Sequence, residues 1–171
     1  PHRMCEGKSI ALVFEKTSTR TRCAFEVAAA DLGMHPVYLD PKGSQIGKKE
    51  SIADTAKMFE GYCDALVIRH ELEGVSKFIS DVVDVPVINA GDGGHQHPTQ
   101  TLTDLLTIKR KKGRLNNMTV GLCGDLKFGR TVHSLIGALS RYTGIKMVLI
   151  SPEELKVPEY VKDEILDKKG I

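Results

Sequence analysis

The chain has 171 residues, 41% of them hydrophobic, which is enough to bury the core of one domain or of one domain and part of another. Its formal net charge of +2 excludes general attraction to nucleic acid or to a membrane surface, and no stretch is long and apolar enough to span a membrane. The cysteines at positions 5, 23, 63 and 123 form no Cys-x-x-Cys pair, so we expect reduced thiols in the cytoplasm.

Apolar runs of strand length alternate with segments of helical period along the whole chain. Strands are predicted at residues 9–14, 35–39, 65–68, 85–88, 118–123 and 147–150. Helices are predicted at residues 20–32, 52–62, 75–82, 98–111, 131–142 and 159–168. This alternation predicts an α/β fold of three layers, with a parallel sheet and helices on both faces.

Several predicted helix ends have a chemical reason. Gly33 is a natural stop for the first helix, and Ser51 with Asp54 is typical of a capping box that opens the second. Pro98 suits the first position of a helix, and Gly113 follows its end.

The polar segment 113–117 is the best domain boundary in the chain. We therefore predict one domain over residues 1–112, ending in the linking helix 98–112, and the start of a second, Rossmann-like α/β domain over 113–171. The basic run at 109–112 is typical of the last turn of that helix, where positive charge complements the dipole.

Residues 18–22 read Ser-Thr-Arg-Thr-Arg, where the first strand gives way to the first helix. The backbone N–H groups of a first helical turn have no internal partner, and hydroxyl and guanidinium groups at the same point favour a phosphate site. Arg22 precedes Glu26 by four residues and is expected to pair with it, which leaves Arg20 for the ligand. The alternative is an ordinary Ser/Thr cap with two exposed arginines.

A second dense stretch runs from residue 89 to residue 100. His97 precedes Pro98, so we expect an extended backbone just before a helix, with the imidazole able to reach a carbonyl oxygen. Gln100 lies in the first helical turn, where its amide can donate and accept. We interpret His95 as structural, and no third ligand at a useful spacing supports a metal site.

Arg69 follows the third apolar run, where a charged side chain needs a polar or anionic partner. A salt bridge to Glu71 or Glu73 is the alternative. Arg20, Arg69, segment 89–100 and Arg130 all follow strands, and ligands of open parallel sheets bind beyond the carboxyl ends of strands. No P-loop or Gly-x-Gly-x-x-Gly occurs, so a nucleotide site is disfavoured.

Residues 14–22 and the His-Pro-Thr-Gln sequence at 97–100 together resemble the aspartate and ornithine carbamoyltransferase family. Residues 9–57 are more similar to the ornithine-specific members. From about residue 62 onward the chain resembles the aspartate-specific members, with markers at 67–70, 86–93 and 124–135.

The resemblance implies transfer of the carbamoyl group of carbamoyl phosphate to L-aspartate, giving N-carbamoyl-L-aspartate and phosphate in pyrimidine biosynthesis, with no cofactor or metal. It assigns phosphate binding to Ser18, Thr19, Arg20 and Thr21. It assigns the carbamoyl oxygen to Thr21, Arg69 and His97, and the carbamoyl amide to Gln100. Arg130 and Thr131 would bind an aspartate carboxylate, whereas Arg130 would repel the extra cation of ornithine.

By the same resemblance the chain forms a homotrimer in which a loop carrying Gln45 and Lys49 enters the neighbouring active site, and regulatory chains are a further partner class. Family catalytic chains are longer, so we expect a fragment, or a mixed or engineered sequence. Two alternatives stay open: an ornithine carbamoyltransferase, and a non-catalytic carbamoyl-phosphate-binding fragment.

Overall fold

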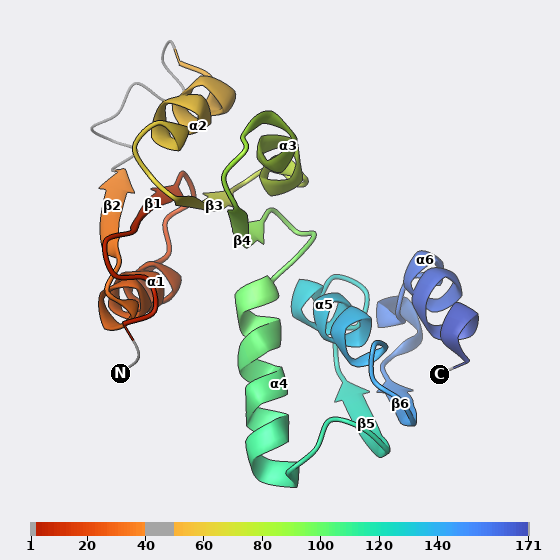
Figure 1. The fold of residues 1–171 in the computed structure, drawn as a ribbon. Coiled ribbons are helices and arrows are strands. Elements are labelled where there is room, and N and C mark those ends of the chain that lie inside the picture. Colours follow the sequence, from red (N-terminus) through yellow and green to blue (C-terminus); the bar gives the residue numbers. More distant parts are fainter. Residues whose placement is uncertain (1–2, 40–49, 171) are drawn as a thin grey trace. The chain divides into compact units, whose positions relative to one another are not determined.

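The computed structural model describes residues 3–39 and 50–170, which form two compact units, Pro1–His95 and Gln96–Ile171 (Figure 1). The first unit contains β1 (Ser9–Phe14), α1 (Thr19–Leu32), β2 (His35–Leu39), α2 (Ile52–Glu60), β3 (Ala65–His70), α3 (Val75–Val82) and β4 (Val87–Asp92). Its strands are all parallel, in the order β2-β1-β3-β4. The predicted α/β class is therefore confirmed.

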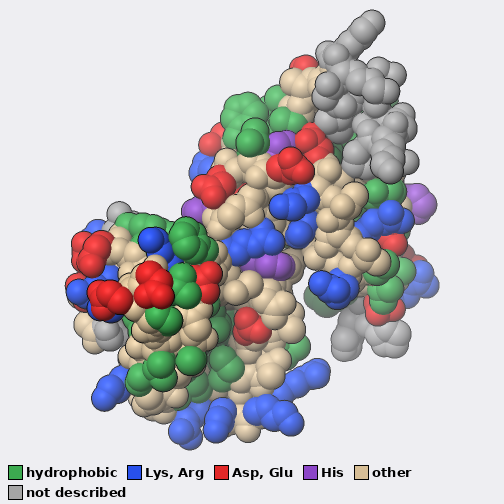
Figure 2. All heavy atoms as spheres, turned by 180° about the vertical axis from the view of Figure 1, so that it is seen from behind, with side chains coloured by type: hydrophobic (Ala, Val, Ile, Leu, Met, Phe, Trp, Pro, Cys, Tyr) green, Lys and Arg blue, Asp and Glu red, His purple; other side chains and the backbone are tan. Residues whose placement is uncertain are grey.

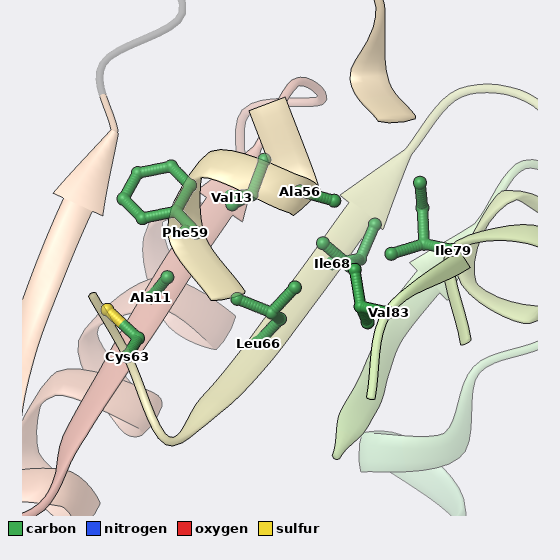
Figure 3. Close-up of a cluster of buried hydrophobic side chains, with 9 residues drawn as sticks. All are labelled: Ala11, Val13, Ala56, Phe59, Cys63, Leu66, Ile68, Ile79 and Val83. Atoms are coloured by element: carbon green, nitrogen blue, oxygen red, sulfur yellow. The ribbon is translucent and has the colours of Figure 1, made fainter. Parts of the chain in front are cut away.

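Side chains of alternating direction build two cores, one on each face of this sheet. On one face Val13 and Ile68 pack with Phe59 of α2 and Ile79 of α3, and the close-up in Figure 3 shows the helical side chains pointing at the strands. On the other face strand residues such as Leu12 pack against α1. The first unit consequently has the three layers that the sequence predicts.

Strands β3 and β4 extend further than the apolar runs that predicted them. The sequence placed Arg69 after its strand, but Arg69 is a member of β3 and pairs with Phe14 of β1. At the next position His70 pairs with Asp92 of β4. Pairing with neighbouring strands, rather than hydrophobicity, thus sets where these strands end.

Local capping signals have the predicted effect. Gly33 ends α1 in the left-handed conformation with φ of 82°, which other residues adopt at a cost. The Ser51 hydroxyl accepts a hydrogen bond of 3.1 Å from the backbone N–H of Asp54 and so opens α2. α1 thus ends, and α2 begins, at the residue that the local chemistry favours.

The second unit contains α4 (Pro98–Lys112), β5 (Met118–Cys123), α5 (Arg130–Leu139), β6 (Ile145–Ile150), the 3₁₀ turn η1 (Glu153–Leu155), α6 (Glu159–Val161) and the π-helical η2 (Lys162–Asp167). β5 and β6 form a parallel pair. Leu122 and Leu126 pack with Ile136 of α5 and with Val161 and Leu166 near the end of the chain. The continuous helix predicted at 159–168 is instead a short α-helix that passes into a π-helical turn.

The division between the two compact units falls before α4, whereas the sequence placed the domain boundary after it. α4 packs against α5, so this helix belongs to the second unit by its contacts. The basic residues 109–112 form its last turn, as predicted, and Figure 2 shows Lys and Arg side chains gathered on the surface around that helix end. In the part of the chain that the structure describes, no helix combines the length and apolar character needed to cross a membrane.

Candidate functional site

The N-terminus of α1 has the features of an anion site. Ser18 occupies the N-cap position with an extended backbone, yet its side chain makes no capping hydrogen bond. The first bond of the helix runs from the N–H of Arg22 to the carbonyl of Ser18, at 3.2 Å. The N–H groups of residues 19–21 therefore have no partner inside the helix, and the positive end of the helix dipole lies there. An oxyanion would satisfy these donors.

The two arginines of this turn have the different environments that their spacing predicts. Nε of Arg22 lies 2.8 Å from Oε1 of Glu26, and its guanidinium stacks on Tyr38 at 3.7 Å from the ring centroid. The hydrogen bond to Glu26 raises the pKa of Arg22 above its ordinary value. Arg20 is exposed, so its guanidinium can reach a ligand in solvent.

Arg69 is buried at the carboxyl end of β3, with 8% of its surface exposed. Its Nη1 donates a hydrogen bond of 2.7 Å to the carbonyl oxygen of Ala90 in β4. Gly91 makes this approach feasible: its φ is +123°, and a Cβ there would lie 2.8 Å from Nη1 of Arg69. A contact between adjacent strands thus orients this guanidinium.

Replacing Gly91 by alanine is expected to displace the Arg69 guanidinium and weaken the binding of an oxyanion ligand at this edge of the sheet, because the new Cβ would overlap Nη1. The matched control is Gly7→Ala, which also has a positive φ but has no atom within 4 Å of its added Cβ. Each variant should lose about 1 kcal/mol or more of unfolding free energy through backbone strain. Isothermal titration calorimetry should show weaker binding for Gly91→Ala alone. Equal affinities in the two variants would contradict the role of Gly91.

The sheet topology brings these elements of the first unit to one place. β2 lies on one side of β1, whereas β3 and β4 lie on the other side. The strand order therefore reverses at β1. Open α/β sheets bind ligands outside the carboxyl ends of the strands at such a switch point. Segment 18–21 follows β1 and Arg69 is the last but one residue of β3, so both belong to this edge of the sheet.

In the second unit His97 forms the N-cap of α4. Its Nδ1 accepts a hydrogen bond of 3.4 Å from the N–H of Gln100, which assigns the ring proton to Nε2. Nε2 is then the nitrogen that can donate to a carbonyl oxygen. The backbone of His97 has φ of −134° and ψ of 67°, which differs from the fully extended conformation that we expected.

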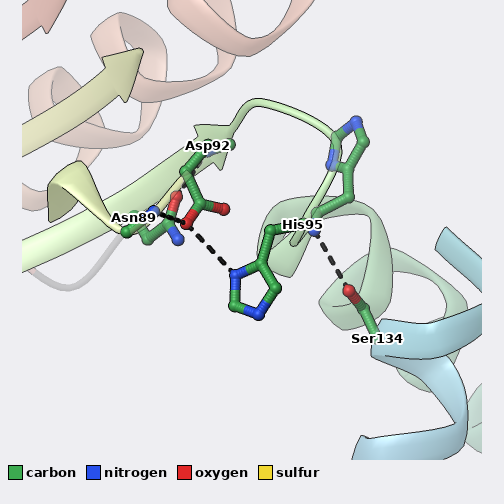
Figure 4. Close-up of polar contacts among 7 residues, drawn as sticks. Asn89, Asp92, His95 and Ser134 are labelled. Carbon is green, nitrogen blue, oxygen red and sulfur yellow. Dashed lines mark hydrogen bonds and ion pairs between the residues drawn. The ribbon is translucent and has the colours of Figure 1, made fainter. Parts of the chain in front are cut away.

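Ser134 of α5 secures this turn, since its hydroxyl accepts a 3.1 Å hydrogen bond from the backbone N–H of His97 (Figure 4). We did not identify Ser134 as a site residue from the sequence. Its spacing of four residues from Arg130 was a usable signal, because residues four apart share one face of a helix. Arg130 and Thr131 open that same helix, both partly buried.

The remaining predicted residues have the following placements. The Gln100 amide donates to Oδ1 of Asp104 at 2.9 Å, so its nitrogen already has a partner within α4. His95, which we interpreted as structural, has its Nδ1 3.4 Å from Oδ2 of the buried Asp92 (Figure 4). Gln45 and Lys49 lie outside the described residues. Within residues 3–39 and 50–170, His, Cys, Asp and Glu form no group of three that could hold a metal ion.

The comparisons with known proteins all point to one family. The carbamoyl-phosphate-binding domain of the aspartate/ornithine carbamoyltransferases matches residues 1–110. The aspartate carbamoyltransferase catalytic subunit of Clostridium acetobutylicum is 59% identical over 167 residues, which are 97% of this chain and 54% of that protein.

Solved structures agree with this result. The catalytic subunit of M. jannaschii aspartate transcarbamoylase superposes with a TM-score of 0.90 at 46% identity, covering 100% of this chain and 56% of that one. The Trypanosoma cruzi enzyme, in complex with carbamoyl phosphate and aspartate, has a TM-score of 0.89 at 36% identity, covering 99% and 55%. The chain thus spans about half the length of the relatives it matches. On this fold and sequence similarity, the chain belongs to the aspartate/ornithine carbamoyltransferase family.

Proposed function

We propose that this chain is part of an aspartate carbamoyltransferase catalytic subunit, which transfers the carbamoyl group of carbamoyl phosphate to the amino group of L-aspartate. The observation that carries this proposal is the uncapped N-terminus of α1 at the switch point of the sheet, at the same edge as the buried Arg69. We assign carbamoyl phosphate binding to residues 1–112 and aspartate binding to residues 113–171.

The phosphate group would bind to the hydroxyls of Ser18, Thr19 and Thr21, the first-turn N–H groups and the guanidinium of Arg20. A doubly charged anion suits this set, since charge-assisted hydrogen bonds are the strongest that a site can offer. The positive end of the α1 dipole adds to the same attraction. Binding here would leave the carbamoyl group toward the tip of β3.

The aspartate amine would attack the carbamoyl carbon, and negative charge would develop on the carbamoyl oxygen. Thr21, Arg69 and Nε2 of His97 are the donors that we assign to that oxygen, while Gln100 and neighbouring backbone would hold the carbamoyl amide. Donors oriented in advance stabilise such a charge without reorganisation. The amine is itself the nucleophile, so the reaction requires no nucleophilic side chain. As the C–N bond forms, the bond between the carbamoyl carbon and the phosphate oxygen would break, and the departing phosphate can accept the amine proton.

The choice of L-aspartate depends on Arg130 and Thr131 at the start of α5. A guanidinium can bind a carboxylate through two parallel hydrogen bonds, whereas it repels the additional ammonium of ornithine. The T. cruzi relative with this fold is described in complex with carbamoyl phosphate and aspartate, and this supports the same pair of substrates here.

Substituting Arg130 by alanine is expected to weaken aspartate binding by about tenfold or more while leaving carbamoyl phosphate binding within about twofold. Separate titrations of the two substrates measure this difference. Lys127→Ala, in the loop that precedes α5, is the control for loss of one positive charge. Equal losses for both substrates in Arg130→Ala would contradict the division of binding between the two parts of the chain.

We also propose a homotrimer in the cytoplasm, with Gln45 and Lys49 acting in the neighbouring active site. The family resemblance supports the shared site, and the four free cysteines support a reducing compartment. Sedimentation equilibrium tests the trimer, and regulatory chains would appear as additional mass in the protein purified from its source.

Turnover of carbamoyl phosphate with L-aspartate tests the proposed reaction directly, with N-carbamoyl-L-aspartate as the measured product. Product formation with ornithine instead would favour the ornithine enzyme. Carbamoyl phosphate binding without turnover of either amine would favour a non-catalytic binding fragment. The observation that favours this candidate is that the chain covers only 54% of the length of its C. acetobutylicum relative.

A further inference from the structure

A hydrogen-bonded histidine–carboxylate pair outside the residues assigned above connects the ends of β1 and β3. Glu15 follows β1 directly, and His70 is the last residue of β3. Nε2 of His70 lies 2.7 Å from Oε2 of Glu15, and only 12% and 22% of the two side chains are exposed. The pair therefore lies at the carboxyl edge of the sheet, adjacent to the chain segment that leads to Ser18.

Both ring nitrogens of His70 are in use. The backbone N–H of Leu72 donates to Nδ1 at 2.9 Å, so Nδ1 is an acceptor and carries no proton. The proton is then on Nε2, which donates it to the Glu15 carboxylate. These two hydrogen bonds fix the orientation of the imidazole ring. The partner of one ring nitrogen also determines whether the other nitrogen donates or accepts.

Glu15 is consequently attached to β3 at two points. Its backbone N–H donates to the carbonyl oxygen of Arg69 at 3.0 Å, and its side chain accepts from His70. Residues 15–18 contain no helix or strand. The N–H of Lys16 makes a longer contact of 3.5 Å to the same Arg69 carbonyl, so Glu15 and Lys16 attach the chain to β3 just before the turn that carries Ser18 and Arg20. The same anchor contacts the backbone of Arg69, the other cationic residue of this edge.

We propose that His70 is a positioning residue for carbamoyl phosphate binding. Through Glu15, His70 holds the turn at residues 18–21 in a fixed position relative to Arg69. This inference rests on the proposed function of the turn. His70 does not contact the ligand. It sets the start of the turn so that the N–H groups, hydroxyls and guanidinium groups meet one phosphate, and a small displacement of such groups has a large effect on binding and catalysis.

Three substitutions of His70 separate positioning from a general contribution to stability. Gln can place an amide donor near the position of Nε2 and keep the bond to Glu15, whereas Asn is too short to reach Glu15 but can supply an acceptor near Nδ1. His70→Ala and His70→Asn should bind carbamoyl phosphate about tenfold more weakly than the unmodified chain, and His70→Gln should restore binding to within about threefold.

Isothermal titration calorimetry with carbamoyl phosphate, accompanied by thermal melting of each variant, tests this inference. Glu15→Gln, which keeps an acceptor for Nε2, provides a second variant that should stay within about threefold of the unmodified chain. The inference is overturned if affinity follows melting temperature across the variants, or if His70→Asn binds as well as His70→Gln. An unmodified chain that does not bind carbamoyl phosphate overturns the proposed function and this inference with it, whereas normal binding by every His70 variant overturns this inference alone.

Discussion

Replacing Arg20 by alanine is expected to weaken carbamoyl phosphate binding by about 100-fold, because the proposed site would lose a guanidinium able to form two charge-assisted hydrogen bonds to the phosphate. Arg20 is exposed in the first turn of α1, so its removal leaves no cavity and little change in stability. Calorimetric titration of the purified variant with carbamoyl phosphate measures the loss. The difference in affinity between the variant and the unmodified chain should become smaller as the salt concentration rises, because salt screens the attraction between exposed charges.

The matched control is Arg22→Ala, which removes the same charge from the same helical turn. Arg22 pairs with Glu26 and stacks on Tyr38, so its loss should affect the surface of α1 and not the ligand. We expect its affinity for carbamoyl phosphate to stay within about threefold of the unmodified chain. If Arg20→Ala binds carbamoyl phosphate with undiminished affinity, the phosphate site is not at the start of α1.

Replacing His97 by asparagine is expected to lower turnover by about 100- to 1,000-fold, which is typical for loss of one donor to a developing oxyanion. Asparagine is among the best N-cap residues, so its side-chain oxygen can replace Nδ1 as acceptor for the N–H of Gln100. The variant therefore keeps the start of α4 and loses only the Nε2 donor. The initial rate of N-carbamoyl-L-aspartate formation measures the effect.

His97→Ala serves as the comparison, because it removes both the donor and the cap. It should lose the same factor in turnover and, in addition, about 1 kcal/mol of unfolding free energy. Melting curves and rates of the two variants together separate the functions of the two ring nitrogens. Turnover by His97→Asn close to that of the unmodified chain would show that the imidazole has only a capping role.

The sequence determined those features that depend on residues within about four positions of one another. Gly33, Ser51 and Pro98 act at helix ends through hydrogen bonds or backbone angles of their own neighbours, and each lies where we predicted. The Arg22–Glu26 pair likewise follows from helical spacing alone. The alternation of apolar runs and helical segments was sufficient for the α/β class.

Only the tertiary structure decided which residues meet across larger separations. The lengths of β3 and β4, the contact of Arg69 with Ala90, the Glu15–His70 pair and the support of His97 by Ser134 all depend on register between strands or packing between helices. A local pattern does not encode such register, because the free energy that selects it comes from burial and hydrogen bonding of the assembled sheet and helices. The sequence therefore predicted the chemical groups of the candidate site, and the fold determined which neighbours orient them.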